Sequence, residues 1–368
     1  MQLTPEETVL LLTCRPRLRD EERAIIRRLS AQPVDWAYVL WRAEFYRTTP
    51  LLFHHLTAAD AIGALPLPAR AYLESWAAMS RARTTVLFDE LGFVIDHLQR
   101  AGIEFFLLKG CALASLLYPD PLLRPMLDLD IMVHPADLES ARRLLFSLRY
   151  VHGVWDYRTN RISRVDYGET DEAEHHELPI LVRTRESTVG VPPSMVPRNW
   201  RRKHIKCYMR GDGRVSFPVF VDLHFNLSVG FEIADVWRGA RLELVQGRLV
   251  RVQSLTGMLW FLAARLYHEA FQYATLKLIM FGDVHAILQQ RGATIDWAEL
   301  LAMAERYAMR PALFYVLSQV SRLTDATVPD IVLEQLRPSP REIPNTHDWG
   351  DVIPKLFSRA ELQDVVLA

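Results

Sequence analysis

Cysteine is scarce in this chain of 368 residues, where only Cys14, Cys111 and Cys207 occur. The three are widely spaced, odd in number and never part of a CxxC pair. Neither a disulfide framework nor a thiolate zinc site is therefore indicated. Without disulfides to maintain, the chain is expected to reside in a reducing cytoplasm.

The chain also lacks an excess of one charge and any long apolar run. Lys and Arg total 43 against 44 Asp and Glu, so the formal net charge is -1 and no bulk positive field attracts polyanions. Glu6 and Glu7 stand where a signal peptide would be basic, and the apolar stretch at 258–264 ends at Arg265. A membrane helix needs roughly 18 to 20 apolar residues. Secretion, membrane insertion and nucleic-acid coating are disfavoured.

Apolar material is present in ordinary amount, since hydrophobic residues make up 50% and charged residues 24% of the chain. This balance excludes wholesale disorder, and the length suggests about two or three domains. Apolar positions recur at intervals of three and four up to residue 98 and again from 254. We therefore expect an N-terminal helical region at 1–98, an α/β core at 99–250 with an insertion at about 151–215, and a C-terminal helical domain at 251–368.

The central region carries the most informative patterns. The apolar run 103–108 predicts a buried strand, and Lys109-Gly110 predicts a tight turn into a helix that ends at Leu117. Strict alternation over 127–133 places Asp128 and Asp130 on one face of a further strand. After a helix from Pro135 to Tyr150, a hairpin is predicted between 204–210 and 215–227. Its second strand places Asp222, His224 and Asn226 on one face.

Three aspartates, Asp128, Asp130 and Asp222, are thus expected on strand faces. Carboxylates that converge repel one another unless a cation neutralises them, and hard oxygen ligands suit Mg²⁺. Two such ions can activate a hydroxyl and stabilise the phosphate oxygens of an in-line displacement. The Lys109-Gly110 turn at a helix N-terminus would present backbone N–H groups to phosphates. A DxD pair alone is typical of a solvated strand face, but the combination favours a nucleoside triphosphate site.

A family resemblance rests on 107–110, 123–133 and 221–224, and it extends to Asp35-Trp36 and to the C-terminal helices. These segments resemble the uncharacterised bacterial nucleotidyltransferase family within the DNA polymerase β-like superfamily. The resemblance implies an α+β fold, with a polymerase β-like nucleotidyltransferase core and a mixed sheet, flanked by N- and C-terminal helical regions. This chain departs from the usual pattern of the superfamily at Gly110-Cys111, where members commonly have Gly-Ser or Gly-Gly.

The same resemblance assigns roles to residues. Asp128 and Asp130 would hold both metal ions, and Asp222 would hold the catalytic ion and help to deprotonate the acceptor hydroxyl. Residues expected to bind the nucleotide are Lys109, Gly110, Cys111, Arg124 and Lys277. Lys109 could equally be solvated, and Arg124 could equally pair with Asp120.

Several histidines and an aspartate are weaker candidates. His224 would orient the surroundings of Asp222, whereas His268 and Asp283 would line the nucleotide site or simply form ion pairs on helices. His175-His176-Glu177 together with His224 suggest zinc. They show neither an HExxH motif nor an i,i+4 spacing, so ordinary strand histidines are the favoured interpretation.

The predicted function is a cytoplasmic nucleotidyltransferase that uses Mg²⁺, with two ions expected and Mn²⁺ as the alternative. It would transfer an NMP from an NTP such as ATP to a hydroxyl or phosphate of a small-molecule or peptide/protein acceptor, releasing pyrophosphate. RNA is a disfavoured partner, although the basic run 198–206 contains Trp200. The alternatives are a DxD glycosyltransferase and a non-catalytic, protein-binding nucleotidyltransferase-like module. Ile131 and Met132 after Asp130 disfavour haloacid dehalogenase chemistry.

Overall fold

The computed structural model describes residues 3–166, 175–190, 206–210, 212, 214–228, 230–273, 277–339 and 342. Contacts between residues divide the chain into two compact units. The helical unit consists of Met1–Glu74 and Leu255–Ala368, and the sheet unit is Ser75–Ser254. Helix α5 (Leu67–Arg100) begins in the first and continues into the second. The predicted boundaries at residues 98 and 250 stay predictions.

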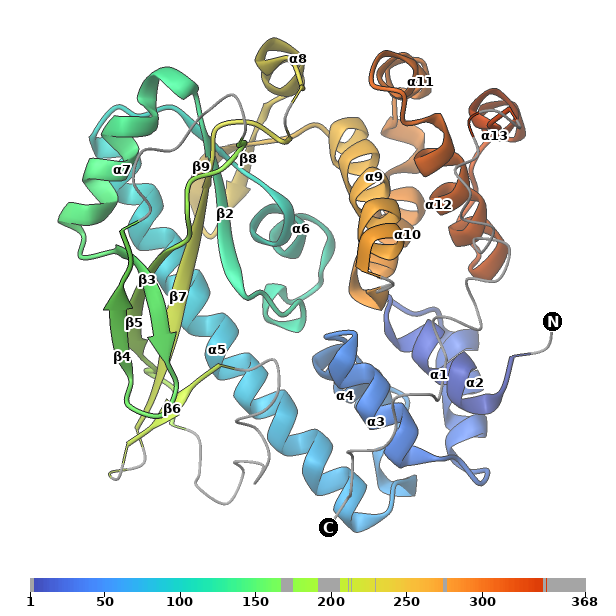
Figure 1. Ribbon diagram of the computed structural model, residues 1–368. Helices are drawn as coiled ribbons and strands as arrows, with labels where there is room; N and C mark the ends of the chain where they lie inside the picture. The colour runs from blue at the N-terminus through green and yellow to red at the C-terminus, as the bar shows by residue number, and fades with distance from the viewer. Residues whose placement is uncertain are drawn as a thin grey trace. The chain divides into compact units, whose positions relative to one another are not determined.

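The helical unit is built from both ends of the chain (Figure 1), which the sequence predicted as two separate helical regions. Side chains at several helix starts satisfy backbone N–H groups: Thr4 and Glu7 form a capping box, and Asp35 and Asp296 cap two further helices. The helices are α1 (Pro5–Thr13), α2 (Asp20–Ser30), α3 (Trp36–Phe45), α4 (Thr49–Ala58), α9 (Leu255–Tyr273), α10 (Leu278–Arg291), α11 (Trp297–Arg306), α12 (Arg310–Leu323) and α13 (Asp330–Leu336). Short 3₁₀ turns lie at Ile62–Ala64 and Gly292–Thr294.

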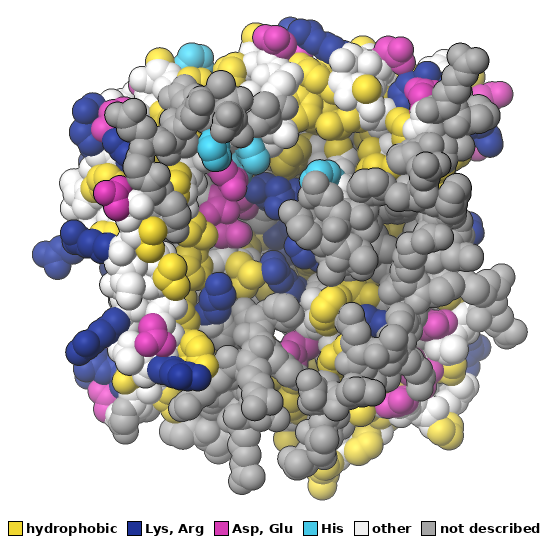
Figure 2. All heavy atoms as spheres, in the orientation of Figure 1, with side chains coloured by type: hydrophobic (Ala, Val, Ile, Leu, Met, Phe, Trp, Pro, Cys, Tyr) yellow, Lys and Arg dark blue, Asp and Glu magenta, His cyan; other side chains and the backbone are white. Residues whose placement is uncertain are grey.

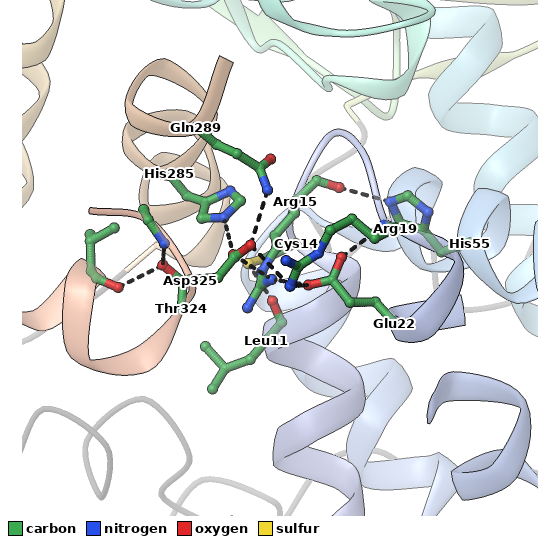
Figure 3. A network of polar contacts seen from close by, with 12 residues as sticks. Leu11, Cys14, Arg15, Arg19, Glu22, His55, His285, Gln289, Thr324 and Asp325 are labelled. Atoms are coloured by element: carbon green, nitrogen blue, oxygen red, sulfur yellow. Dashed lines mark hydrogen bonds and ion pairs between the residues drawn. The ribbon is translucent and has the colours of Figure 1, made fainter. Parts of the chain in front are cut away.

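A buried polar network joins the N-terminal and C-terminal helices of this unit (Figure 3). Arg15 Nη1 lies 2.5 Å from Glu22 Oε1 and 3.1 Å from Asp325 Oδ1, and His285 Nε2 lies 3.0 Å from the same Asp325 oxygen. At Gly282 a Cβ would come within 2.1 Å of the Cys14 carbonyl oxygen, so α10 packs directly on the end of α1. The two ends of the chain therefore share one core.

The sheet unit contains a nine-stranded sheet among the described residues, in the order β4-β3-β5-β7-β2-β1-β9-β8, with β6 paired to β7. It is mixed, because β2 runs parallel to β7 and β1 parallel to β9 while the other pairs are antiparallel. The strands are β1 (Phe105–Leu107), β2 (Asp128–Val133), β3 (Val151–Asp156), β4 (Arg161–Arg164), β5 (Leu181–Glu186), β6 (Tyr208–Met209), β7 (Val215–His224), β8 (Arg241–Val245) and β9 (Arg248–Val252). The helices are the end of α5, α6 (Lys109–Leu117), α7 (Leu138–Ser147) and α8 (Ile233–Arg238), with 3₁₀ turns at Pro121–Leu123 and Pro135–Asp137.

The predicted mixed α+β class is confirmed, and so are the central strands and the helix at 109–117. The predicted hairpin is present as the antiparallel pair of β6 and β7. Two features differ from expectation. The described strands of the insertion join the main sheet, because β5 pairs with β7 along six residues. The hairpin of β8 and β9 was not predicted; it turns at Gln246 and Gly247, whose φ angles are 52° and 75°.

The central strands are buried on both faces, so their alternation does not mark a solvated side. Every residue of β7 except Asp222 is buried, and every residue of β2 except Asp128. Helix α6 packs against β2 (Figure 1). Polar groups that remain on such strands are held in a largely dry environment, where they need a partner. None of the described helices combines the length and hydrophobicity required to cross a lipid bilayer.

Candidate active site

The site is organised by the parallel pairing of β2 and β7. In this register Asp130 stands directly opposite Asp222, and Asp128 stands opposite Phe220. Because successive side chains of a strand alternate between faces, Asp128 and Asp130 share a face, and Asp222 and His224 extend it across the neighbouring strand. The structure thus brings together the aspartates that the sequence placed on separate strands.

Asp130 is the centre of a tight cluster of charged groups. Its Oδ1 lies 2.5 Å from Lys109 Nζ and 3.2 Å from His224 Nε2, and its side chain is 4% exposed. Burial by itself would raise the pKa of Asp130, but the Lys109 ammonium and His224 outweigh burial and hold that pKa below its ordinary value. Asp130 is therefore ionised throughout the physiological range.

Lys109 reaches this position through an unusual backbone conformation. Its φ is 46°, in the left-handed region that residues other than glycine and asparagine seldom adopt. The Leu108 N–H donates to the Asp130 carbonyl oxygen at 3.1 Å, so the start of α6 is fixed to β2 just before this turn. Backbone strain of this kind clusters at functional sites, and here it accompanies an ammonium held on the Asp130 carboxylate.

Asp222 experiences the opposite electrostatic environment. Burial, followed by the negative charges of Asp128, Asp130 and Glu177, raises the pKa of Asp222 to about 8. Lys109 opposes this shift only in part. If all were ionised, these carboxylates would carry more negative charge than Lys109 neutralises.

Glu177 is a member of the cluster that sequence reasoning did not assign to this site. It forms a bridge with His224 at the end of β7, and its Oε2 lies 3.1 Å from His224 Nδ1. The pairing joins residues far apart in the chain. Its only sequence signal was the adjacent His175-His176-Glu177 run, which has no spacing typical of a site.

The donor set suits divalent cations at two adjacent positions. Asp130, Asp222 and His224 offer ligand atoms that all lie within 4.8 Å of one another, as do His176, Glu177 and His224. The first group supplies two carboxylate oxygens, which Mg²⁺ prefers, together with an imidazole nitrogen. Asp128 lies on the same strand face but is not a member of either group. On the face shown in Figure 2, acidic side chains adjoin histidines and cationic side chains.

Gly110 and Arg124 lie together at the N-terminus of α6. A Cβ at Gly110 would be 2.7 Å from Arg124 Nη1 and 3.1 Å from the Met126 side chain, so glycine permits this close approach. Leu108 at the N-cap makes no side-chain hydrogen bond to the first turn. Cys111, next along, is fully buried, and burial raises the pKa of its thiol. Its side chain is therefore a neutral part of the core.

Comparison with known proteins supports a specific family for this arrangement. Residues 32–325 match the family described as uncharacterised nucleotidyltransferase. The chain belongs to this family. No curated protein matches it. Among solved structures, an antigenic nucleotidyltransferase-like protein from Paracoccidioides brasiliensis matches with 14% identity and a TM-score of 0.28, covering 64% of this chain and 91% of that one. The family prediction is confirmed, whereas the bacterial origin and the polymerase β-like superfamily stay predictions.

A buried arginine of α5 holds the backbone that precedes the aspartates of β2. Arg83 donates from Nε to the Met126 carbonyl oxygen at 3.3 Å, from Nη2 to that of Leu127 at 3.0 Å, and from Nη1 to that of Lys206 at 2.9 Å. Two of these carbonyls immediately precede Asp128. Arg83 therefore fixes the backbone that leads into β2. The sequence analysis did not identify this role of Arg83.

The remaining residues predicted to serve the nucleotidyltransferase belong to the helical unit. Lys277 Nζ lies 2.6 Å from Glu269 Oε2, Asp283 is fully buried on α10, and His268 is exposed on α9. Their assignment to the nucleotide stays a prediction. Apart from Lys206, the basic run at 198–206 lies outside the described residues.

Proposed function

We propose that this family member is a Mg²⁺-dependent nucleotidyltransferase that moves an NMP from an NTP to a hydroxyl or phosphate of a small-molecule or peptide/protein acceptor. One observation carries the proposal: Asp130 and Asp222 face each other across parallel strands, directly beside Lys109 at the start of α6. This arrangement supplies carboxylates for a cation and N–H groups for phosphates within one site.

Asp128, Asp130 and Asp222 are the residues proposed to hold the ions, two Mg²⁺ or alternatively Mn²⁺. When bound, the ions would neutralise phosphate charge and lower the pKa of the acceptor hydroxyl. Asp222 lies on β7, whereas Asp128 and Asp130 lie on the neighbouring strand β2. We assign to its carboxylate the additional role of taking the acceptor proton.

The N-terminus of α6 is proposed to hold the triphosphate. Its first N–H groups are not capped by Leu108, and Gly110 allows a phosphate to approach the backbone closely. Lys109 would exchange its contact with Asp130 for a triphosphate oxygen, because both partners are anionic and lie at the same helix end. Arg124, packed over Gly110, would add a second cation.

The proposed reaction is a single displacement at the α-phosphorus. The acceptor oxygen forms a bond to this phosphorus while the bond to the bridging oxygen of the β-phosphate breaks. Pyrophosphate leaves with that electron pair, and the acceptor proton passes to Asp222. In this proposal the protein contributes mainly position and electrostatic stabilisation, as is general for phosphoryl transfer.

The proposal can be tested with NTPs labelled at the α-phosphate, Mg²⁺ and a panel of small-molecule and protein acceptors. The wild type should transfer label and release pyrophosphate, whereas Asp130→Asn should do neither. Asp89→Asn, on the exposed face of α5, is the matched control and should retain activity. Transfer that persists in Asp130→Asn, or NTP binding that needs no metal and ignores this substitution, would refute the proposed site.

A further inference from the structure

We propose that His176, Glu177 and His224 form a separate Zn²⁺ site beside the aspartates. The three side chains offer two imidazole nitrogens and one carboxylate oxygen, all within 4.8 Å of one another. Such a donor set is typical of Zn²⁺ sites with three protein ligands, whereas Mg²⁺ prefers oxygen ligands. This site does not depend on the proposed nucleotide transfer.

The spacing of the donor atoms suits a single small ion. Glu177 Oε2 lies 3.1 Å from His224 Nδ1 and 3.8 Å from His176 Nε2. Ligands held at roughly 2.0–2.2 Å from a tetrahedral Zn²⁺ lie about 3.3–3.6 Å from one another. The rings of His176 and His224 are inclined by only 28°, with centroids 6.0 Å apart. Shifts of a few tenths of an ångström would bring the Glu177 oxygen to this spacing from both imidazole nitrogens.

The environment of His224 provides a second, independent indication. This side chain is 2% exposed, and its Nδ1 makes no hydrogen bond despite the nearby Glu177 oxygen. On the other side of the ring, Nε2 lies 3.2 Å from Asp130 Oδ1 and 3.3 Å from Lys109 Nζ. A proton on Nε2 that is donated to Asp130 leaves the Nδ1 lone pair directed at the proposed ion.

This arrangement matches the usual support of a histidine that ligates a metal. Such a histidine typically donates its other ring N–H to a carboxylate, which fixes the tautomer and the ring orientation. With its proton on Nε2, His224 would have Asp130 as that carboxylate. In this tautomer, a cation at Nδ1 would also remove the unfavourable approach of a nitrogen lone pair to the Glu177 carboxylate.

The backbone holds the two ligand-bearing segments together. The N–H groups of Phe225 and Asn226 donate to the His176 carbonyl oxygen at 3.0 and 3.1 Å, and the Leu178 N–H donates to that of Leu223 at 2.9 Å. These bonds flank Glu177 on one segment and His224 on the other. The ligands are therefore positioned before any ion binds, which lowers the entropic cost of binding.

The test is a Zn²⁺ titration of the full chain, measured by competition with a chromogenic chelator. His176→Gln and Glu177→Gln should each weaken Zn²⁺ binding by at least about 100-fold, since each removes one of three ligands. His175→Gln is the matched control, because it changes the neighbouring histidine, which lies outside the cluster. Circular dichroism of each variant checks that it is folded. An X-ray absorption spectrum of the Zn²⁺ form should show two imidazole ligands, and only one in His176→Gln.

Two results would overturn this site. Equal binding by wild type and His176→Gln would mean that Zn²⁺ binds elsewhere. Zn²⁺ binding lost in Asp222→Asn but retained in Glu177→Gln would place the ion at Asp130, Asp222 and His224 instead. Nucleotide transfer is measured separately, so failure of the zinc site leaves the proposed transferase unaffected, and the reverse also holds.

Discussion

Each compact unit contains a cluster of charged side chains centred on buried members, and the two clusters differ in how their charges balance. In the helical unit, Arg15 and Arg19 face Glu22 and Asp325, two cations against two carboxylates. Burial lowers the pKa of His285, so this histidine joins the network neutral. In the sheet unit, by contrast, Lys109 pairs with Asp130 within a group of four carboxylates that influence one another, namely Asp128, Asp130, Asp222 and Glu177.

The pKa values of Asp325 and Asp222 are shifted in opposite directions. Burial alone would raise the pKa of Asp325, but His285 and Arg15 lower it below its ordinary value. The pKa of Asp222 is raised to about 8 because burial and the nearby like charges act in the same direction. A cluster that the chain neutralises by itself contributes to stability, whereas one left with excess negative charge is suited to bind a cation. We therefore propose a structural role for the first cluster and, in line with the proposed function, a cation-binding role for the second.

The largest expected effect comes from removing a carboxylate of the sheet-unit cluster. Asp222→Asn should lower nucleotide transfer roughly 1,000-fold, equivalent to about 4 kcal/mol, because the amide neither neutralises a cation nor accepts the proton. The metal-free variant should be at least as stable as the wild type, since like-charge repulsion falls. Initial rates and urea unfolding measure the two quantities. Asp325→Asn should show the opposite result, with activity retained and stability reduced.

Breaking the balanced cluster should affect stability only. Arg15→Leu leaves the Glu22 and Asp325 carboxylates with less positive charge, at a cost of about 3–5 kcal/mol for a buried pair. Urea unfolding of the whole chain measures the cost. Arg17→Leu, on the same segment but exposed, should change little. A loss below about 1 kcal/mol for Arg15→Leu would argue against a structural role for this network.

Arg83 should affect activity without touching a reacting group. Arg83→Gln removes donors to the Met126 and Leu127 carbonyls, so the backbone before Asp128 is less well fixed. Because small displacements of catalytic groups can cost up to about 100-fold in rate, kcat should fall by tenfold or more. The control is Arg81→Gln, because Arg81 belongs to the same helix and its side chain is exposed. An unchanged kcat would exclude a positioning role.

The pH dependence of metal binding should distinguish the clusters further. The raised pKa of Asp222 means that its carboxyl is largely protonated at pH 7, so a cation must displace that proton. Binding should release close to one proton at pH 7, and affinity should fall about tenfold from pH 7 to pH 6. Calorimetry in buffers of different ionisation enthalpy measures the release. The Asp222→Asn variant should release no proton on metal binding. If it still releases one, the proton comes from another group.

Local patterns were sufficient to predict much of the site. Alternation placed Asp128 and Asp130 on one strand and Asp222 on another, and the start of α6 was predicted from Lys109-Gly110. These features depend on residues close in sequence, where the strand and helix periods are visible directly. That the strand of Asp128 and Asp130 lies near the strand of Asp222 could be inferred only from chemistry. Carboxylates on two strands can converge when a cation neutralises their charge.

The rest of the site depends on contacts between distant segments. Glu177 is placed beside His224 by an isolated one-residue β-bridge. Arg83 contacts the backbone before β2 from α5, a helix whose sequence shows only an apolar repeat. The left-handed conformation of Lys109 also has no signal in residue type, because lysine seldom adopts it. The hairpin of β8 and β9 is short and partly exposed, so its alternation was too weak to recognise.

The register of β2 and β7 makes the site an all-or-none product of folding. A slip of one residue between these strands would put Val221 or Leu223 opposite Asp130, and every side chain of the slipped strand would change face. A misassembled molecule would therefore be inactive rather than partly active. Metal binding to the aspartates can consequently serve as a measure of how many molecules in a preparation have completed this sheet.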